Sequence, residues 1–257
     1  MSINEIDETK MRRAQNGGSL FAATCPPCGK LLFCGERRNM EDAGVIVPWT
    51  MYLMYGDMRI LERHYTAMQR YIEFLEHESH EWLRPNQGLG DWLSVGAATP
   101  NDLLATAYFA YSVSLMQRIA GVLGFDSDAE RYAKQFVHIR RAFAAEFVEE
   151  DGSLRGNTQT GYVLALHMNL LEGDERSQAI ARLADDIECR NDHLTTGFVG
   201  VSYLLPVLSE CGRTDLAYRL LHQESYPSWL YSVKQGATTI WERWDGWTEA
   251  GGFQTPE

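Results

Sequence analysis

The sequence contains no run of about 18 consecutive apolar residues, the length that a helix needs to cross a bilayer. It also lacks a basic segment followed by an apolar segment near its N-terminus, the order that marks a secretory signal. We therefore expect a cytoplasmic protein that has no membrane as a partner.

Basic residues are scarce in this chain. Lysine and arginine together number 23, against 35 aspartates and glutamates, which gives a formal net charge of −12. Nucleic acids and anionic membranes attract proteins through basic patches, and no basic run offsets the negative charge here. We therefore expect no nucleic-acid partner.

The five cysteines are an odd number, and the sequence offers no secretory context in which disulfides would form. Cys25, Cys28 and Cys34 have a spacing similar to part of a zinc knuckle, but a fourth ligand is missing nearby. The next histidine, His64, falls within an expected helix. We therefore expect free thiols and no metal site.

Alternation of apolar and polar residues, the pattern of a strand, is hard to find. From about residue 43 onward, apolar residues instead recur every three and four positions, the period of one helical face. One such stripe consists of Leu104, Tyr108, Tyr111, Leu115, Ile119 and Val122. The sequence predicts an all-α protein with four helical hairpins, near residues 43–78, 99–149, 159–188 and 197–223.

Glycines mark the expected hairpin turns. In each turn a glycine suited to the left-handed conformation precedes a side chain that can cap the next helix. The four turns are Gly56-Asp57, Gly124-Phe125-Asp126, Gly173-Asp174 and Gly212-Arg213-Thr214-Asp215. Thr99 is expected to cap a further helix, because Pro100 suits a first turn and Asp102 favours the helix dipole.

Repeated hairpins stack as an open solenoid or close into a toroid, and periodicity does not choose between these two arrangements. The hairpins share no clear consensus, and long connections rich in Trp, Gly and Asp follow them. Because loops on a rigid scaffold often carry function, we favour a closed helical barrel with a functional face. Residues 1–41 show no sustained helical stripe and are expected to form an irregular lead-in.

One glutamate, Glu242, stands among three tryptophans within residues 236–247. A sugar ring has apolar faces that stack on indoles, and hydroxyls that bind carboxylates and guanidinium groups. The segment is therefore typical of a sugar site. A buried tryptophan cluster with a surface salt bridge is the alternative that a single motif leaves open.

Four motifs follow one another along the chain: DAGVIVPWTMY at 42–52, GDWL at 90–93, LTTGFVG at 194–200 and GATTIWERWDGW at 236–247. In this order, residues 42–257 resemble the catalytic domain of bacterial α-L-rhamnosidases. The resemblance implies an (α/α)6 barrel of six hairpins, inverting hydrolysis of terminal α-L-rhamnose from glycosides, and no cofactor. Only four hairpins are recognised, so we expect the barrel to be incomplete.

The resemblance also implies roles for single residues. Glu242 resembles the general base that activates the attacking water in an inverting mechanism. Trp92 is expected to line the rhamnose pocket, with core packing between hairpins as the alternative. Asp91 is either a pocket acceptor or a helix cap, and Asp42 in the first motif is expected to contact the sugar.

The neighbours of Glu242 complete the expected substrate site. Trp241 and Trp244 are expected mainly to support the glutamate. Arg243 and Asp245 either orient Glu242 or pair with each other, and the sequence does not separate these two roles.

The sequence departs from the family pattern upstream of Asp42. The general acid of the family lies in an Arg-Glu-Arg-Leu-Gly-Trp-Thr-Gly-Asp segment, and Glu36-Arg37-Arg38 is only a faint echo of it. Met40 stands where the family has a sugar-contacting tryptophan, and the chain stops before a Ser-Phe-Asn-His-Tyr segment. We expect very slow turnover or none, with Glu36 or Glu41 as the alternative acid, and self-association through open barrel edges.

Two other interpretations stay open. The first is another (α/α)6 glycosidase or a polysaccharide lyase, since a fold does not fix a substrate. The net charge of −12 disfavours a lyase, because a lyase needs a basic pocket for acidic sugars. The second is a non-catalytic truncated remnant or a sugar-binding helical scaffold, which accounts for the missing segments.

Overall fold

A computed structural model describes residues 42–88 and 90–253 of the chain. Helices dominate the described residues, and the short strands β1 (Trp247–Thr248) and β2 (Gly252–Phe253) pair antiparallel. The helices are α2 (Ala43–Tyr55), α3 (Arg59–His77), α4 (Asn101–Val122), α5 (Asp126–Phe147), α6 (Gln159–His167), α7 (Gly173–Cys189), α8 (Phe198–Glu210), α9 (Thr214–Leu221) and α10 (Trp229–Lys234). None of these helices is both long and apolar enough to cross a membrane.

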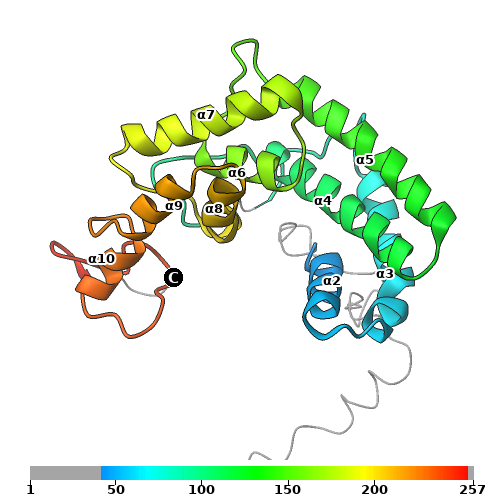
Figure 1. Cartoon of the computed structure of the whole chain (residues 1–257), viewed down its shortest axis with the longest axis horizontal. Helices are drawn as coiled ribbons and strands as arrows, with labels where there is room; N and C mark the ends of the chain where they lie inside the picture. The colour runs from blue at the N-terminus through cyan, green and yellow to red at the C-terminus, as the bar shows by residue number, and fades with distance from the viewer. Residues whose placement is uncertain (1–41, 89, 254–257) are drawn as a thin grey trace, which may run out of the picture.

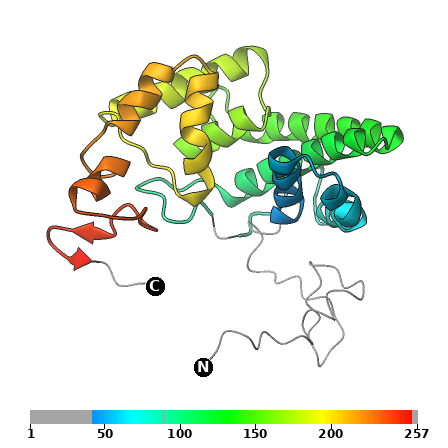
Figure 2. The same ribbon diagram turned by 60° about the horizontal axis from the view of Figure 1, so that its bottom comes forward.

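The helices pair into the four hairpins that the sequence predicts: α2–α3, α4–α5, α6–α7 and α8–α9. The hairpins follow one another along an arch, with α2 at one end and α10 at the other (Figure 1). Turning the molecule shows α10 and the β1–β2 ladder at the α8–α9 end of this arch (Figure 2). The prediction of an all-α hairpin fold is therefore confirmed, with one small ladder added.

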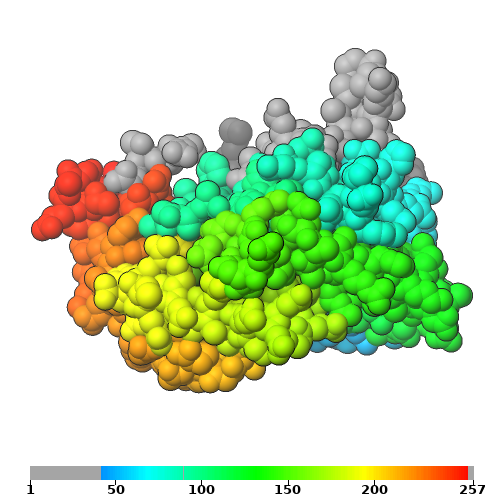
Figure 3. All heavy atoms as spheres, turned by 90° about the horizontal axis from the view of Figure 1, so that it is seen from above, coloured from blue at the N-terminus to red at the C-terminus, as the bar shows by residue number. Residues whose placement is uncertain are grey.

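The first helix of each hairpin forms an inner layer and the second helix forms an outer layer. The inner helices α2, α4, α6 and α8 contact each other in sequence order, and each packs on its own outer partner. Helices α5 and α7 of the outer layer form much of the surface seen from above the arch (Figure 3). The structure thus has the double helical layer expected of a hairpin barrel.

Helix sequence explains which layer each helix joins. The outer helix α5 buries one stripe, which includes Tyr132, Ile139 and Phe143, and exposes charged residues on its other face. The inner helix α4 is covered on more than one side, because Leu103 and Ala107 are buried in addition to Leu104. The single apolar stripe predicted for this helix was therefore incomplete, and its members Tyr108 and Tyr111 are only half-buried.

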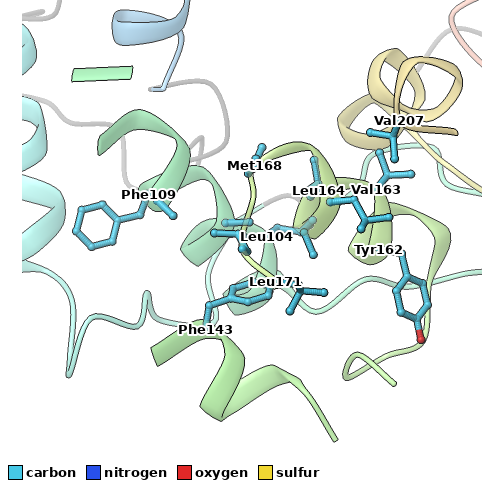
Figure 4. Close-up of a cluster of buried hydrophobic side chains, with 14 of the residues drawn as sticks. Leu104, Phe109, Phe143, Tyr162, Val163, Leu164, Met168, Leu171 and Val207 are labelled. Carbon is cyan, nitrogen blue, oxygen red and sulfur yellow. The ribbon is translucent and has the colours of Figure 1, made fainter. Parts of the chain in front are cut away.

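The two layers meet in one hydrophobic core. Leu104, Phe143 and Leu164 come from α4, α5 and α6, and they lie in one cluster with Val207 of α8 (Figure 4). Each of these four side chains is at most 1% exposed. Helix α2, in contrast, exposes the large apolar side chains of Val47, Met51, Leu53, Met54 and Tyr55.

The hairpin turns confirm the glycine prediction but correct the capping prediction. All four glycines have positive φ: Gly56, Gly124, Gly173 and Gly212. The predicted side-chain caps of α5, α7 and α9 are wrong, because these helices have no such hydrogen bond. In addition, Gly173 begins α7 instead of ending α6. Only Asp57 accepts a hydrogen bond from the next helix, from Arg59 N at 3.0 Å.

The predicted cap at the start of α4 is also wrong. Thr99 makes no cap there, and its Oγ1 instead shares a 2.7 Å hydrogen bond with Oγ1 of Thr158, the residue that caps α6. In the same region Val95 N donates to Thr195 O at 2.9 Å. The connections before α4, α6 and α8 therefore meet, and they bring the first turns of three inner helices together.

Helix α8 packs closely against α6 at Gly200, and this contact gives a test of the inner layer. A Cβ atom at Gly200 would lie 2.6 Å from Thr160 Oγ1 and 3.0 Å from Thr196 Cγ2. We expect Gly200→Ala to lower the free energy of unfolding by about 1–3 kcal/mol, because a stiff, β-branched neighbour has little room to move. Urea denaturation monitored by circular dichroism measures this change.

Gly121, in α4, provides the matched control. An added Cβ there meets nothing within 4 Å. We expect Gly121→Ala to raise the free energy of unfolding by about 0.5–1 kcal/mol, because alanine favours the helix more than glycine does. Equal effects of the two substitutions would contradict the close packing of α6 against α8.

Candidate functional site

Asp91 lies where the connection before α4 meets the N-terminus of α8. Its side chain is 7% exposed and accepts three hydrogen bonds. Oδ2 accepts from Thr160 Oγ1 at 2.5 Å and from Gly197 N at 2.8 Å, and Oδ1 accepts from Val199 N at 2.9 Å. The carboxylate thus caps α8 from a distant part of the chain. Its contact with a sugar stays a prediction.

Trp92 follows Asp91 and is held through its backbone. The Trp92 carbonyl oxygen accepts a hydrogen bond from Phe198 N at 3.0 Å. Only glycine fits at position 197, because a Cβ there would lie 2.2 Å from that same oxygen. The indole itself is 44% exposed, which argues against the alternative of core packing between hairpins.

Trp244 reaches the same turn from the C-terminal motif. Its Nε1 donates to Thr196 O at 2.9 Å, and its ring packs edge-on against Trp229 at 5.4 Å between centroids. Trp241 packs edge-on against Phe253 of β2 at 6.3 Å. These contacts hold both indoles in place, and their expected role in supporting Glu242 stays a prediction.

Glu242 lies between Trp241 and Arg243, and its side chain is exposed. Arg243 and Asp245 pair with each other: Nε donates to Oδ1 at 2.6 Å and Nη2 donates to Oδ2 at 3.2 Å. The hydrogen bonds from the guanidinium lower the pKa of Asp245. Of the two roles predicted for these residues, the structure shows the mutual pair.

The C-terminal motif also encloses a pocket of about 370 Å³. Its lining combines indole rings, a guanidinium group and hydroxyl groups, and the volume falls at the lower end of ligand-binding pockets. The lining residues are Trp229, Ser232, Val233, Ala237, Thr238, Thr239, Ile240, Trp241, Arg243 and Trp244. Such a mixture suits a small ring with one apolar face and several hydroxyls.

Asp42 occupies a different environment at the start of α2. The side chain is 5% exposed, and Oδ1 accepts from Ser112 Oγ at 2.7 Å and from Tyr71 Oη at 3.1 Å. Burial raises the pKa of Asp42 to about 6, and the two hydrogen bonds only partly oppose this rise. A carboxyl group from α2 is thus held by residues of α3 and α4.

Two tyrosines connect Asp42 with the α8 region. Tyr108 of α4 and Tyr203 of α8 lie within interaction range of each other, and both interact electrostatically with Asp42. Tyr108 also interacts with Asp91. Burial is the main cause of the raised pKa of Tyr108. The phenol of Tyr108 therefore lies within electrostatic range of both buried aspartates.

Sequence reasoning missed these bridging residues for identifiable reasons. Tyr108 belongs to the predicted helical stripe, and nothing in the stripe distinguishes it from the apolar residues beside it. Thr196 belongs to a recognised motif, but its backbone oxygen makes the contact with Trp244, and backbone contacts leave no side-chain signal. Within the described residues, no group of three or more His, Cys, Asp or Glu side chains is placed to hold a metal ion.

The raised pKa of Asp42 predicts a pH-dependent stability. The native state holds this proton more tightly than the unfolded chain does, since the pKa rises from 3.8 to about 6 on folding. Stability from this group is therefore lost as the pH rises from about 4 to about 6, with an upper limit of about 3 kcal/mol. Asp42→Asn keeps an acceptor oxygen for Ser112 and Tyr71 but cannot ionise.

We therefore expect Asp42→Asn to be more stable than the natural sequence at pH 7.5, and we expect this advantage to shrink toward pH 4.5. Urea unfolding of both proteins at several pH values measures the difference between their free energies of unfolding. The titration of all groups that the two proteins share cancels in this difference. An advantage that stays constant across this range would show that Asp42 keeps its charge in the folded protein.

The geometry can be compared with known proteins. A family model described as the bacterial alpha-L-rhamnosidase 6 hairpin glycosidase domain matches residues 8–255. The α-L-rhamnosidase of Streptomyces avermitilis is 46% identical over 247 residues, which cover 96% of this chain and 24% of that protein. The α-L-rhamnosidase of Alteromonas sp. (strain LOR) is 42% identical over 224 residues, which cover 82% of this chain and 24% of that protein.

Solved structures agree with the family model. The structure of the Streptomyces avermitilis enzyme in complex with L-rhamnose has a TM-score of 0.80 and 48% identity to this chain, and the match covers 83% of this chain and 21% of that one. The chain thus spans about a quarter of the length of the relatives that it matches. Because the family model covers most of the sequence, the chain belongs to the bacterial α-L-rhamnosidase six-hairpin glycosidase family.

Proposed function

We propose that this chain forms part of the site of an inverting glycosidase that releases terminal α-L-rhamnose from glycosides. The observation that carries the proposal is the turn at residues 195–199, which joins two of the aromatic motifs. The turn binds the backbone of Trp92 on one side and the indole of Trp244 on the other. A relative that shares 48% identity with this chain was solved in complex with L-rhamnose, which supports the choice of sugar.

The residues around this turn match the chemistry of rhamnose. A deoxysugar with a methyl group presents an apolar face, and the exposed indole of Trp92 offers a flat surface for it. The hydroxyl groups of the sugar need polar partners, which the threonines and Arg243 of the C-terminal pocket offer. We therefore take a rhamnose-containing glycoside as the substrate.

Glu242 is the proposed general base. Its carboxylate would take a proton from the attacking water while an acid protonates the leaving oxygen from the other side of the ring. The two carboxyl groups of an inverting enzyme are about 6.5–9.5 Å apart, which leaves room for the water. The alternative acids Glu36 and Glu41 lie outside the described residues, so the acid is not assigned.

A base without an assigned acid predicts a dependence on the leaving group. We expect the chain to hydrolyse 2,4-dinitrophenyl α-L-rhamnoside faster than 4-methylumbelliferyl α-L-rhamnoside, because a weakly basic leaving group needs little protonation. Glu242→Gln should lower the rate on the dinitrophenyl substrate by about 100-fold or more, the range that general-base catalysis supplies. Initial rates of phenol release, corrected for spontaneous hydrolysis, measure both effects.

Glu249 supplies the matched control for this experiment. Its side chain is exposed and lies seven positions after Glu242 in the same C-terminal segment. We expect Glu249→Gln to keep the rate of the natural sequence. Equal release by the natural sequence and by Glu242→Gln would remove Glu242 from the mechanism.

Binding of the free sugar tests the proposed sugar site separately from catalysis. We expect L-rhamnose to bind the chain, and we expect Trp92→Ala to weaken this binding about three- to tenfold, the loss that one stacked aromatic contact produces. Isothermal titration calorimetry measures the affinity without relying on tryptophan fluorescence. Trp49→Ala, in α2, is the control that should bind as the natural sequence does.

Two outcomes of this titration separate the proposed function from its alternative. Binding without turnover would support a sugar-binding helical scaffold. Absence of any heat change with the natural sequence would contradict a rhamnose site on this chain.

The predictions of a cytoplasmic location and of self-association also stay proposals. Exposed apolar side chains on α2, which include Met51, Leu53 and Met54, support self-association, because such patches favour contact with another surface.

A further inference from the structure

We infer that Asp91 is a positioning residue that couples Trp92 to Trp244 through the turn at residues 195–199. This inference rests on the proposed function, because both indoles belong to the proposed sugar site. It goes further by assigning to Asp91 the task of fixing the two indoles relative to each other. Three links carry it.

The first link is the set of hydrogen bonds to the Asp91 carboxylate. Two of its three donors, Gly197 N and Val199 N, are backbone groups at the start of α8, and the third is the Thr160 hydroxyl of α6. Hydrogen bonds to a carboxylate are stronger than hydrogen bonds between neutral groups, and helix N-termini favour negative charge. The carboxylate therefore fixes the backbone of the turn to the first turn of α6.

The second link joins this turn to Trp92. Phe198 N donates to Trp92 O at 3.0 Å, and Val95 N donates to Thr195 O at 2.9 Å. The absence of a side chain at Gly197 lets the two segments approach closely, since a Cβ there would lie 2.2 Å from Trp92 O and 2.7 Å from Ser94 N. Residues 91–95 and 195–199 are thus held against each other by two backbone hydrogen bonds.

The third link joins the other side of the turn to Trp244. Nε1 of Trp244 donates to Thr196 O, the carbonyl group directly before Gly197. Thr196 is completely buried, so water does not readily replace this bond. A change in the backbone at Gly197 must therefore reach Trp244, although Asp91 and Trp244 belong to separate motifs.

The arrangement also separates positioning from direct sugar binding. Oδ2 of Asp91 already accepts two hydrogen bonds, and the whole side chain is only 7% exposed. The exposed neighbour Trp92 is the group that offers its surface to a ligand. Asp91 acts on the sugar through that neighbour and through the turn.

Nuclear magnetic resonance of the ¹⁵N-labelled full chain tests this coupling without a ligand. The seven tryptophans give indole N–H signals, and the variants Trp244→Phe and Trp92→Phe identify the signals of these two residues. We expect Asp91→Asn to shift the Trp244 indole signal and to accelerate its exchange with solvent about threefold or more, as for coupled residues of one network. Thr160→Val, which removes one of the three hydrogen bonds, should act in the same direction but less strongly.

Two internal comparisons separate coupling from a general loss of stability. The indole signal of Trp49, on α2, should stay unchanged in Asp91→Asn. Asp102→Asn, which removes a charge from the first turn of α4, should leave the Trp244 signal unchanged. Should Asp91→Asn fail to fold, the milder Thr160→Val still decides the question.

The outcomes also distinguish this inference from the proposed function. An unchanged Trp244 signal in Asp91→Asn and in Thr160→Val, together with faster exchange of the Gly197 amide, would overturn the coupling whatever L-rhamnose does. A shifted Trp244 signal in a chain that does not bind L-rhamnose would support the coupling and would contradict the proposed function alone.

Discussion

The placement of one buried carboxylate at the N-terminus of α8 is the constraint on which the rest of the site depends. Asp91 brings together a connection, the first turn of α6 and the start of α8, which are far apart in sequence. A buried charge is costly unless donors surround it, so the carboxylate tolerates little change in this geometry. The positions of the aromatic residues on both sides of the turn therefore depend on this carboxylate.

The double helical layer supports the geometry around the Asp91 carboxylate. Inner helices packed on both sides cannot easily rotate or slide, because a close-packed interior leaves no free volume. The close contact of α6 and α8 at Gly200 lies one turn away from Gly197, where the Asp91 carboxylate binds. The inner layer is therefore closely packed directly below the connections that carry the aromatic residues, which is where a binding site needs fixed geometry.

The sequence predicted the hairpins well and their caps poorly, for physical reasons. Helical periodicity and left-handed glycines are local signals, so the four hairpins and the glycines at 56, 124, 173 and 212 were predictable. Thr99 illustrates the failure, since a threonine before a helix is usually a cap, but here a tertiary contact with Thr158 takes its hydroxyl. The mutual pair of Arg243 and Asp245 was foreseen as one of two options, whereas the contact of Trp244 with a backbone oxygen leaves no trace in the sequence.

The two buried aspartates show why residue type alone does not set a role. Asp91 binds two backbone N–H groups at a helix N-terminus, where the helix dipole stabilises a charge. Asp42 precedes α2 but makes no capping bond, and its donors are the hydroxyl groups of Ser112 and Tyr71. Burial raises the pKa of Asp42 to about 6, and these two hydrogen bonds only partly oppose the rise. A sequence motif identifies both residues as important, but only the donors around each carboxylate show that Asp91 fixes backbone groups of α8 whereas Asp42 accepts from side chains of α3 and α4.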